Sequence, residues 1–124
     1  MIRLNMLVEG QTEEAFVNKV LKPYLAQINV FVSVRRWFTN RKLGTKGGGK
    51  NYSLFFNDMQ KWIKQERNNS QVYFSMMIDL YAFPKGDNSP YTDEISRIQD
   101  IYMKIETLEE KIRTQFPISN FIPY

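Results

Sequence analysis

Apolar and polar residues fall into blocks along this chain, and each block has the period of either a strand or a helix. Runs of apolar, β-branched and aromatic residues predict four strands, at residues 2–8, 28–38, 72–78 and 120–124. Apolar residues three or four positions apart predict three helices between them, at residues 12–27, 53–67 and 91–115. Pro23 is expected to kink the first helix or to end it early.

Each predicted helix carries one apolar stripe that we expect to face a sheet. In the first helix the stripe is Phe16, Val17, Val20, Leu21, Tyr24 and Leu25. In the second it is Phe55, Met59, Trp62 and Ile63, and in the third Ile95, Ile98, Tyr102, Ile105, Leu108 and Ile112. Strands that alternate with helices predict right-handed crossovers. The expected fold is one α/β domain over residues 1–124, a Rossmann-like, mainly parallel sheet of about four strands with helices on both faces.

The composition narrows the possible chemistry. The 124 residues include no cysteine and no histidine, which excludes zinc–thiolate sites and nucleophiles activated by histidine. Carboxylates, lysines, arginines, hydroxyl groups or a hard metal ion must therefore carry any reaction, and oxygen ligands favour Mg²⁺ or Mn²⁺. No apolar run approaches the length of a membrane span, and the first twenty residues do not resemble a signal peptide. We therefore expect a cytoplasmic protein.

Positive charge is concentrated in one part of the chain. The net charge is +4, but residues 15–57 contain eight basic residues and no acidic one, while the remainder is net acidic. Such asymmetry suits an anionic polymer, so we predict a DNA or RNA contact. The predicted contact residues are Arg35, Arg36, Arg41, Lys42, Lys46 and Lys50. A basic loop that only faces solvent is the alternative.

Residues 44–50 nearly spell the phosphate-binding P-loop of NTPases. Gly44, Gly49 and Lys50 stand at the expected spacing, but Asn51 occupies the place of the magnesium-binding serine or threonine. A P-loop also follows directly on a buried strand, whereas the polar residues 39–42 intervene here. The glycines are better explained by close approach of the backbone to phosphates, or by a simple surface loop.

Two predicted strands end on an acid. Glu9 follows the first strand and Asp79 the third, and the carboxyl ends of parallel strands share one edge of a sheet. Two carboxylates brought together are relieved by a divalent cation or a shared proton, so we predict a magnesium site there. Asp87 and Glu13 are candidates for further ligands.

Structural explanations compete for each of these acids. Glu13 and Glu14 suit the first turn of a helix for which Thr12 is the expected N-cap. Asp79 could cap a helix or pair with a basic residue. Asp87, between Gly86 and Asn88, fits an ordinary turn better than a ligand.

Four ordered motifs resemble the DUF4276 family, which is regarded as Toprim-like. They are residues 8–13, with the sequence VEGQTE, the glycine-rich residues 46–48 followed by Tyr52, residues 79–81 followed by Pro84, and residues 121–124. Toprim domains occur in topoisomerases, primases and OLD-type nucleases. The resemblance implies that Glu9 is the glutamate that moves a proton or binds metal, and that Asp79 is the first metal-binding aspartate.

The chain departs from the Toprim pattern in two ways. Tyr81 stands where the second aspartate of the Asp-x-Asp motif is expected, so one metal ligand is lacking. The resemblance also implies that the chain, either a fragment or a shortened member, lacks a C-terminal region of the family. The expected function is Mg²⁺-dependent, nuclease-like processing of nucleic acid. The resemblance further implies an AAA/SMC-like ATPase partner in bacterial defence or repair. The alternative is a non-catalytic module that binds nucleic acid or docks an ATPase.

Overall fold

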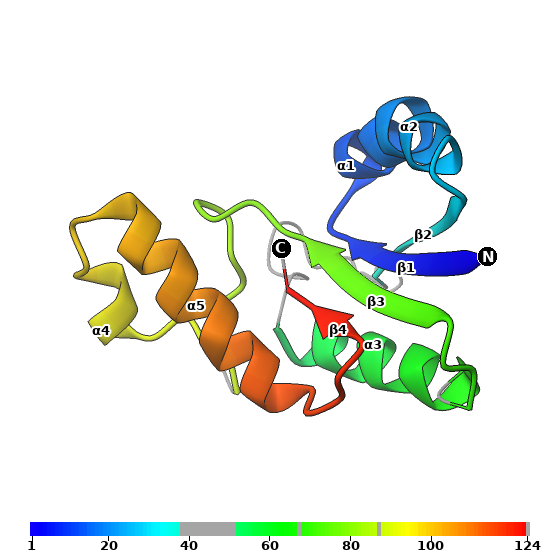
Figure 1. Cartoon of the computed structure of the whole chain (residues 1–124). Helices are drawn as coiled ribbons and strands as arrows, with labels where there is room; N and C mark the ends of the chain where they lie inside the picture. The colour runs from blue at the N-terminus through cyan, green and yellow to red at the C-terminus, as the bar shows by residue number, and fades with distance from the viewer. Residues whose placement is uncertain (38–51, 67, 87, 124) are drawn as a thin grey trace, which may run out of the picture.

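The structure is an α/β sheet with helices on both faces (Figure 1). This computed structural model describes residues 1–37, 52–66, 68–86 and 88–123. The elements are, in order, β1 (Ile2–Val8), α1 (Gln11–Phe16), the π-helix η1 (Val17–Leu21), α2 (Lys22–Ala26), β2 (Val30–Arg36), α3 (Tyr52–Glu66), β3 (Val72–Met77), α4 (Asp93–Ser96), α5 (Ile101–Gln115) and β4 (Phe121–Ile122). Within those residues, no helix combines the length and apolar composition needed to cross a membrane.

The four predicted strands form a single sheet in the order β2-β1-β3-β4, and all neighbouring pairs are parallel. The register pairs Val8 of β1 with Arg36 of β2 on one side and with Met77 of β3 on the other. The α/β fold class and the mainly parallel sheet are therefore confirmed. The carboxyl ends of β2, β1 and β3 lie side by side at one edge of the sheet.

One face of the sheet is covered by the continuous helical segment α1–η1–α2, which lies opposite α3 in Figure 1. Val17, Leu21 and Leu25 of this segment pack on Met6 and Val32. The other half of the predicted stripe is wrong, because its residues are exposed to solvent: Phe16, Val20 and Tyr24. Each precedes an inward residue by one position and is rotated by about 100° around the helix, away from the contact with the sheet.

The start and the middle of this helical segment also differ from expectation. Gly10, in an extended conformation, is the N-cap, so Thr12 is not, and it lies inside α1. Pro23 does not end the helix early, because the chain stays helical through α2, whose first turn contains Pro23. The π-helical turn η1 directly precedes α2 and joins it to α1.

The opposite face carries the larger core, which is rich in aromatic residues. The predicted stripe of α3 is confirmed, because Phe55, Met59, Trp62 and Ile63 are all buried against the sheet and α5. Tyr52, at the start of α3, stacks on Phe83, with ring centres 5.9 Å apart. Its hydroxyl donates a hydrogen bond to Gln115 of α5, and burial raises the pKa of that hydroxyl. Tyr52 therefore joins α3 to α5 as a neutral donor.

The predicted helix over residues 91–115 is two helices. The short α4 ends at Ser96, and α5 begins after Asp100. The Asp100 carboxylate accepts hydrogen bonds from the backbone N–H groups of Tyr102, at 2.9 Å, and Met103, at 3.2 Å. An aspartate that satisfies two free N–H groups favours a new helix start over continuation of the first helix. Only the second half of α5 packs fully into the core, at Leu108 and Ile112, whereas Tyr102 and Ile105 are exposed.

Candidate functional site

Glu9 is the first residue beyond β1 and is held between two neighbouring strands. Its backbone N–H donates to the carbonyl of Met77 at 3.3 Å, while the N–H of Trp37 donates to the carbonyl of Val8 at 3.1 Å. Both bonds continue the parallel ladders past the last strand residues. Glu9 is only 5% exposed, so its carboxylate lies at the sheet edge with little contact with bulk water.

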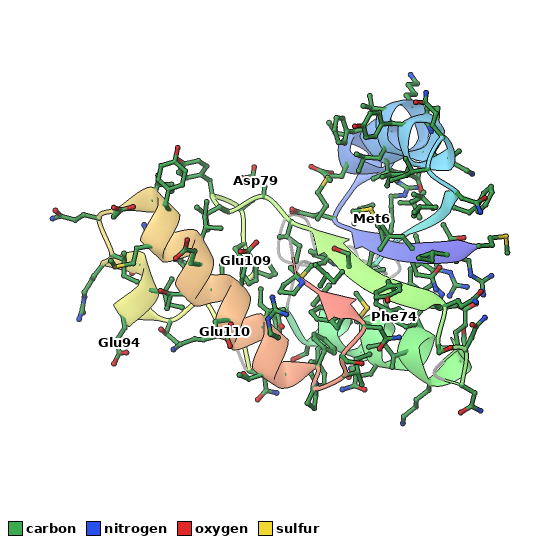
Figure 2. The ribbon with its side chains drawn as sticks, viewed as in Figure 1. Met6, Phe74, Asp79, Glu94, Glu109 and Glu110 are labelled. Carbon is green, nitrogen blue, oxygen red and sulfur yellow. The ribbon has the colours of Figure 1, made fainter. Side chains whose placement is uncertain are left out.

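Asp79 lies two residues beyond β3, the strand next to β1. Figure 2 labels it on the loop that leaves the carboxyl end of β3. Because Val8 pairs with Met77, Glu9 and Asp79 follow adjacent strand ends, as predicted for a shared edge. Unlike Glu9, Asp79 is exposed, and one of its carboxylate oxygens accepts a hydrogen bond from the backbone N–H of Tyr81 at 3.0 Å. This Asx-type turn fixes one oxygen and leaves the second available.

The side chain of Glu13, in the first turn of α1, lies close to the backbone of Gly10, the residue after Glu9. A Cβ atom added at Gly10 would lie 3.3 Å from Oε2 of Glu13, so that carboxylate folds over the backbone next to Glu9. A side chain at position 10 would therefore require a small shift of the Glu13 carboxylate. Glu14 faces the neighbouring strand instead, and its Oε2 lies 3.7 Å from Nε of Arg36.

The described basic residues flank this edge on the other side of β1. Arg35 and Arg36 are the last two residues of β2 and pair in register with Leu7 and Val8. The other four predicted contact residues, Arg41, Lys42, Lys46 and Lys50, lie outside the described residues, as does the P-loop-like stretch 44–50. Asp87 lies outside them too. Within the ranges that the structure does describe, no three acidic side chains are grouped closely enough to hold a metal ion.

The sequence analysis missed a set of polar residues on α3. Asp58, Lys61 and Gln65 line a cavity of about 230 Å³ together with Trp62, Arg35 and Arg36. The spacing of three and four positions between these polar residues places them on one face of a helix, and that spacing is visible in the sequence. Nothing in the spacing of residues indicates that this face meets the end of β2.

A second cavity lies between the segment that follows β3 and α5. Its volume is about 330 Å³, and apolar side chains form nearly all of its wall: Met76, Ile78, Leu80, Phe83, Ile105, Leu108 and Ile112. Glu109, labelled in Figure 2, also lines it. Burial beside these apolar groups raises the pKa of the Glu109 carboxyl, Arg113 lowers it in part, and Glu106 adds to the rise. The folded protein therefore binds a proton at Glu109 more tightly than the unfolded chain does.

We expect Glu109→Gln to raise the thermal midpoint at pH 7 and to have a smaller effect at pH 4. A carboxyl whose pKa is raised in the folded state destabilises that state once it ionises. This destabilisation grows as the pH rises above 4.5, the ordinary pKa of a glutamate carboxyl. Thermal unfolding of both proteins across this pH range measures the difference. Glu110→Gln is the control, because the Glu110 side chain is 71% exposed. A pH-independent difference at Glu109 would contradict the prediction.

Comparison with known proteins identifies a family but no individual relative. Neither a curated protein nor a solved structure matched the chain. The family model described as "Domain of unknown function (DUF4276)" matches residues 8–124, which is nearly the whole chain and includes Glu9, Glu13 and Asp79. This match confirms the resemblance noted in the sequence motifs. The chain belongs to the DUF4276 family.

Proposed function

We propose that this protein is a Toprim-like, Mg²⁺-dependent, nuclease-like domain that acts on nucleic acid at the carboxyl edge of its sheet. One observation carries the proposal: the register of the parallel strands aligns the ends of β2, β1 and β3. Arg36, Glu9 and Asp79 therefore follow one another along a single edge. Arginine forks bind phosphate oxygens, and carboxylates hold hard cations, so this order suits a phosphodiester and its metal ion.

The residues present fit Mg²⁺ or Mn²⁺. Magnesium in enzymes that act on phosphates is commonly held by one or two carboxylates, with water and substrate oxygens as the other ligands. Glu9 and Asp79 would hold the ion, and Glu13 is close enough to the same turn to orient a bound water. When bound, the cation would supply positive charge to the phosphate oxygens. Glu9, in its nearly dry position, would take a proton from the attacking water or return one to the leaving group.

The proposed cellular location and partner rest on the family resemblance. The proposal places the protein in the cytoplasm, with an AAA/SMC-like ATPase as partner in bacterial defence or repair. The substrate can be DNA or RNA. The chemistry of the sheet edge supports the nucleic-acid part of the proposal and is independent of the ATPase.

A second candidate is a non-catalytic module that binds nucleic acid or docks an ATPase. The observation that favours it is the segment after β3. Tyr81 replaces the second aspartate of the Toprim motif, and its side chain is 91% exposed rather than directed into the fold. The Tyr81 N–H also engages one oxygen of Asp79. On this proposal the edge would bind a phosphate backbone without cutting it.

Direct measurement of Mn²⁺ binding tests the metal site. We expect titration calorimetry to show Mn²⁺ affinity at least about tenfold weaker in Glu9→Gln and in Asp79→Asn than in the wild-type protein. Asparagine keeps the oxygen that accepts from the Tyr81 N–H and removes only the charge, so the turn should persist. Glu94→Gln, an exposed acid in the first turn of α4, is the matched control. Equal affinity in all four proteins would reject the site.

A further inference from the structure

The polar cavity between β2 and α3 is separate from the predicted metal ligands. Two cationic residues at the end of β2 and four residues from one face of α3 form its walls, and Leu7 of β1 contributes an apolar side chain. The polar lining residues are Arg35, Arg36, Asp58, Lys61 and Gln65, with Trp62 as the aromatic member. Three positive side chains and one negative side chain therefore surround the space.

The Arg35 guanidinium stacks on Trp62 in this cavity. Its guanidinium carbon lies 4.1 Å from the centre of the Trp62 ring, and its Nη1 donates to Oε1 of Gln65 at 3.5 Å. Trp62 is itself buried and packs edge-on against Phe74, with ring centres 6.4 Å apart. A guanidinium stacked on a rigid ring keeps the other N–H groups at its edge available to an anion. The core of the protein thus prearranges one anion donor.

Arg36 and Lys61 add positive charge to the same cavity. Arg36 also pairs with Glu14 across 3.7 Å, but both side chains are partly exposed, and such pairs hold a side chain only weakly. Lys61 extends from the exposed side of α3. Asp58 and Glu14 offset two of the three positive charges of Arg35, Arg36 and Lys61, so one positive charge is in excess. This excess attracts a phosphate group, and a monoester, with three terminal oxygens, offers more acceptors to the cationic side chains than a diester does.

The size and position of the cavity define the ligand further. Its volume of about 230 Å³ lies below the range of about 300–1,000 Å³ typical of pockets that enclose a drug-sized ligand. It therefore suits a phosphate group rather than a whole nucleotide. Arg36 pairs in register with Val8, the residue before Glu9, so the cavity adjoins the edge that carries the predicted metal ligands. A phosphate held here would place the attached strand beside Glu9.

We propose that this cavity binds the terminal phosphate monoester of a nucleic-acid strand through Arg35, Arg36 and Lys61. This inference rests on the proposed function only in that the ligand is a nucleic acid. It does not require the cation site. A pocket for a terminal phosphate would let the protein select strand ends over continuous strands.

The test compares oligonucleotides of one sequence that carry a 5′-phosphate, a 3′-phosphate or two hydroxyl ends. Binding is measured by fluorescence anisotropy in EDTA, which removes any contribution from divalent cations. We expect at least about tenfold higher affinity for one phosphorylated end, because charge-assisted hydrogen bonds would be added. Lys61→Ala should remove this preference and leave the affinity for the hydroxyl-ended strand nearly unchanged. Arg35→Gln should remove the preference too, but it should also weaken binding of all three strands, because Arg35 is one of the predicted nucleic-acid contact residues.

Lys64→Ala is the matched control for Lys61→Ala. Lys64 is exposed on the same helix but does not line the cavity, so this variant should keep the preference. Equal affinity for all three strands would overturn the phosphate pocket and leave nucleic-acid binding intact. Absence of binding to every strand would overturn the proposed function together with the inference. Displacement of the phosphorylated strand by inorganic phosphate at an equal concentration would overturn the assignment to a nucleic-acid end, because free phosphate would then be the ligand.

Discussion

Replacement of Phe55 with alanine is expected to lower the free energy of unfolding by about 3–5 kcal/mol. The Phe55 side chain is completely buried in α3. Its ring centre lies 5.5 Å from that of Trp37, 5.4 Å from that of Tyr52 and 6.0 Å from that of Phe116. Loss of the ring would leave a void among three aromatic partners that cannot all move inward. Urea denaturation of both proteins, followed by circular dichroism, measures the difference.

Phe16→Ala makes the same chemical change where no core exists. The Phe16 side chain is 44% exposed on α1, so its loss should cost about 1 kcal/mol or less. If both variants lost the same stability, the position of Phe55 at the centre of the core would be wrong. The result also bears on function, because Trp37 directly follows Arg36. A void beside Trp37 would loosen the end of β2 that presents both arginines.

The sheet and the second helix could be predicted from the sequence because their signals are local. Strand β3 is apolar at every position except Ser75, and the apolar spacing of α3 predicts residues that the structure buries. Parallel pairing follows from the alternation of strands and helices, and it predicts that Glu9 and Asp79 share one edge of the sheet. Backbone periodicity alone carries this information.

The errors arose where periodicity gives no unique answer. Two adjacent apolar stripes run along α1–η1–α2, and only contact with the sheet decides that Leu21 faces inward and Val20 does not. The break at Asp100 lies within an apolar spacing that continues from Ile95 to Ile112, so periodicity favoured one helix. Asp100 is itself a capping signal, because aspartate is favoured at the N-cap of a new helix.

The candidate site was also only partly predictable from the sequence. Its carboxylates follow from strand ends, but the cavity that pairs Arg35 with Trp62 depends on how α3 crosses the sheet. Arg35 and Trp62 are 27 positions apart in the chain, and no local rule relates a strand end to a helix face at that separation. The orientation of these side chains could not be predicted either, because the spacing of residues determines neither the burial of Glu9 nor the Asx-type turn of Asp79.

On the proposed function, cleavage of nucleic acid in the presence of Mn²⁺ should fall by about 10²–10⁴-fold in Glu9→Gln, the range for loss of a positioned acid–base group. Glutamine matches glutamate in size, so the tight position between β2 and β3 should tolerate it. Asp79→Asn should also abolish most activity, through loss of metal affinity. Single-stranded and duplex forms of DNA and RNA are the substrates, and labelled products resolved on gels give the rates.

Glu94→Gln shows whether the effect belongs to the sheet edge. Glu94 lies on α4, well away from Asp79 in Figure 2, and its loss should leave the rate unchanged. Cleavage that survived both Glu9→Gln and Asp79→Asn would exclude these carboxylates as the catalytic site. A wild-type protein that bound strands and Mn²⁺ but cut none would instead support the non-catalytic module. In that case Tyr81, in place of a second aspartate, would be the residue that separates a phosphate-binding edge from a nuclease.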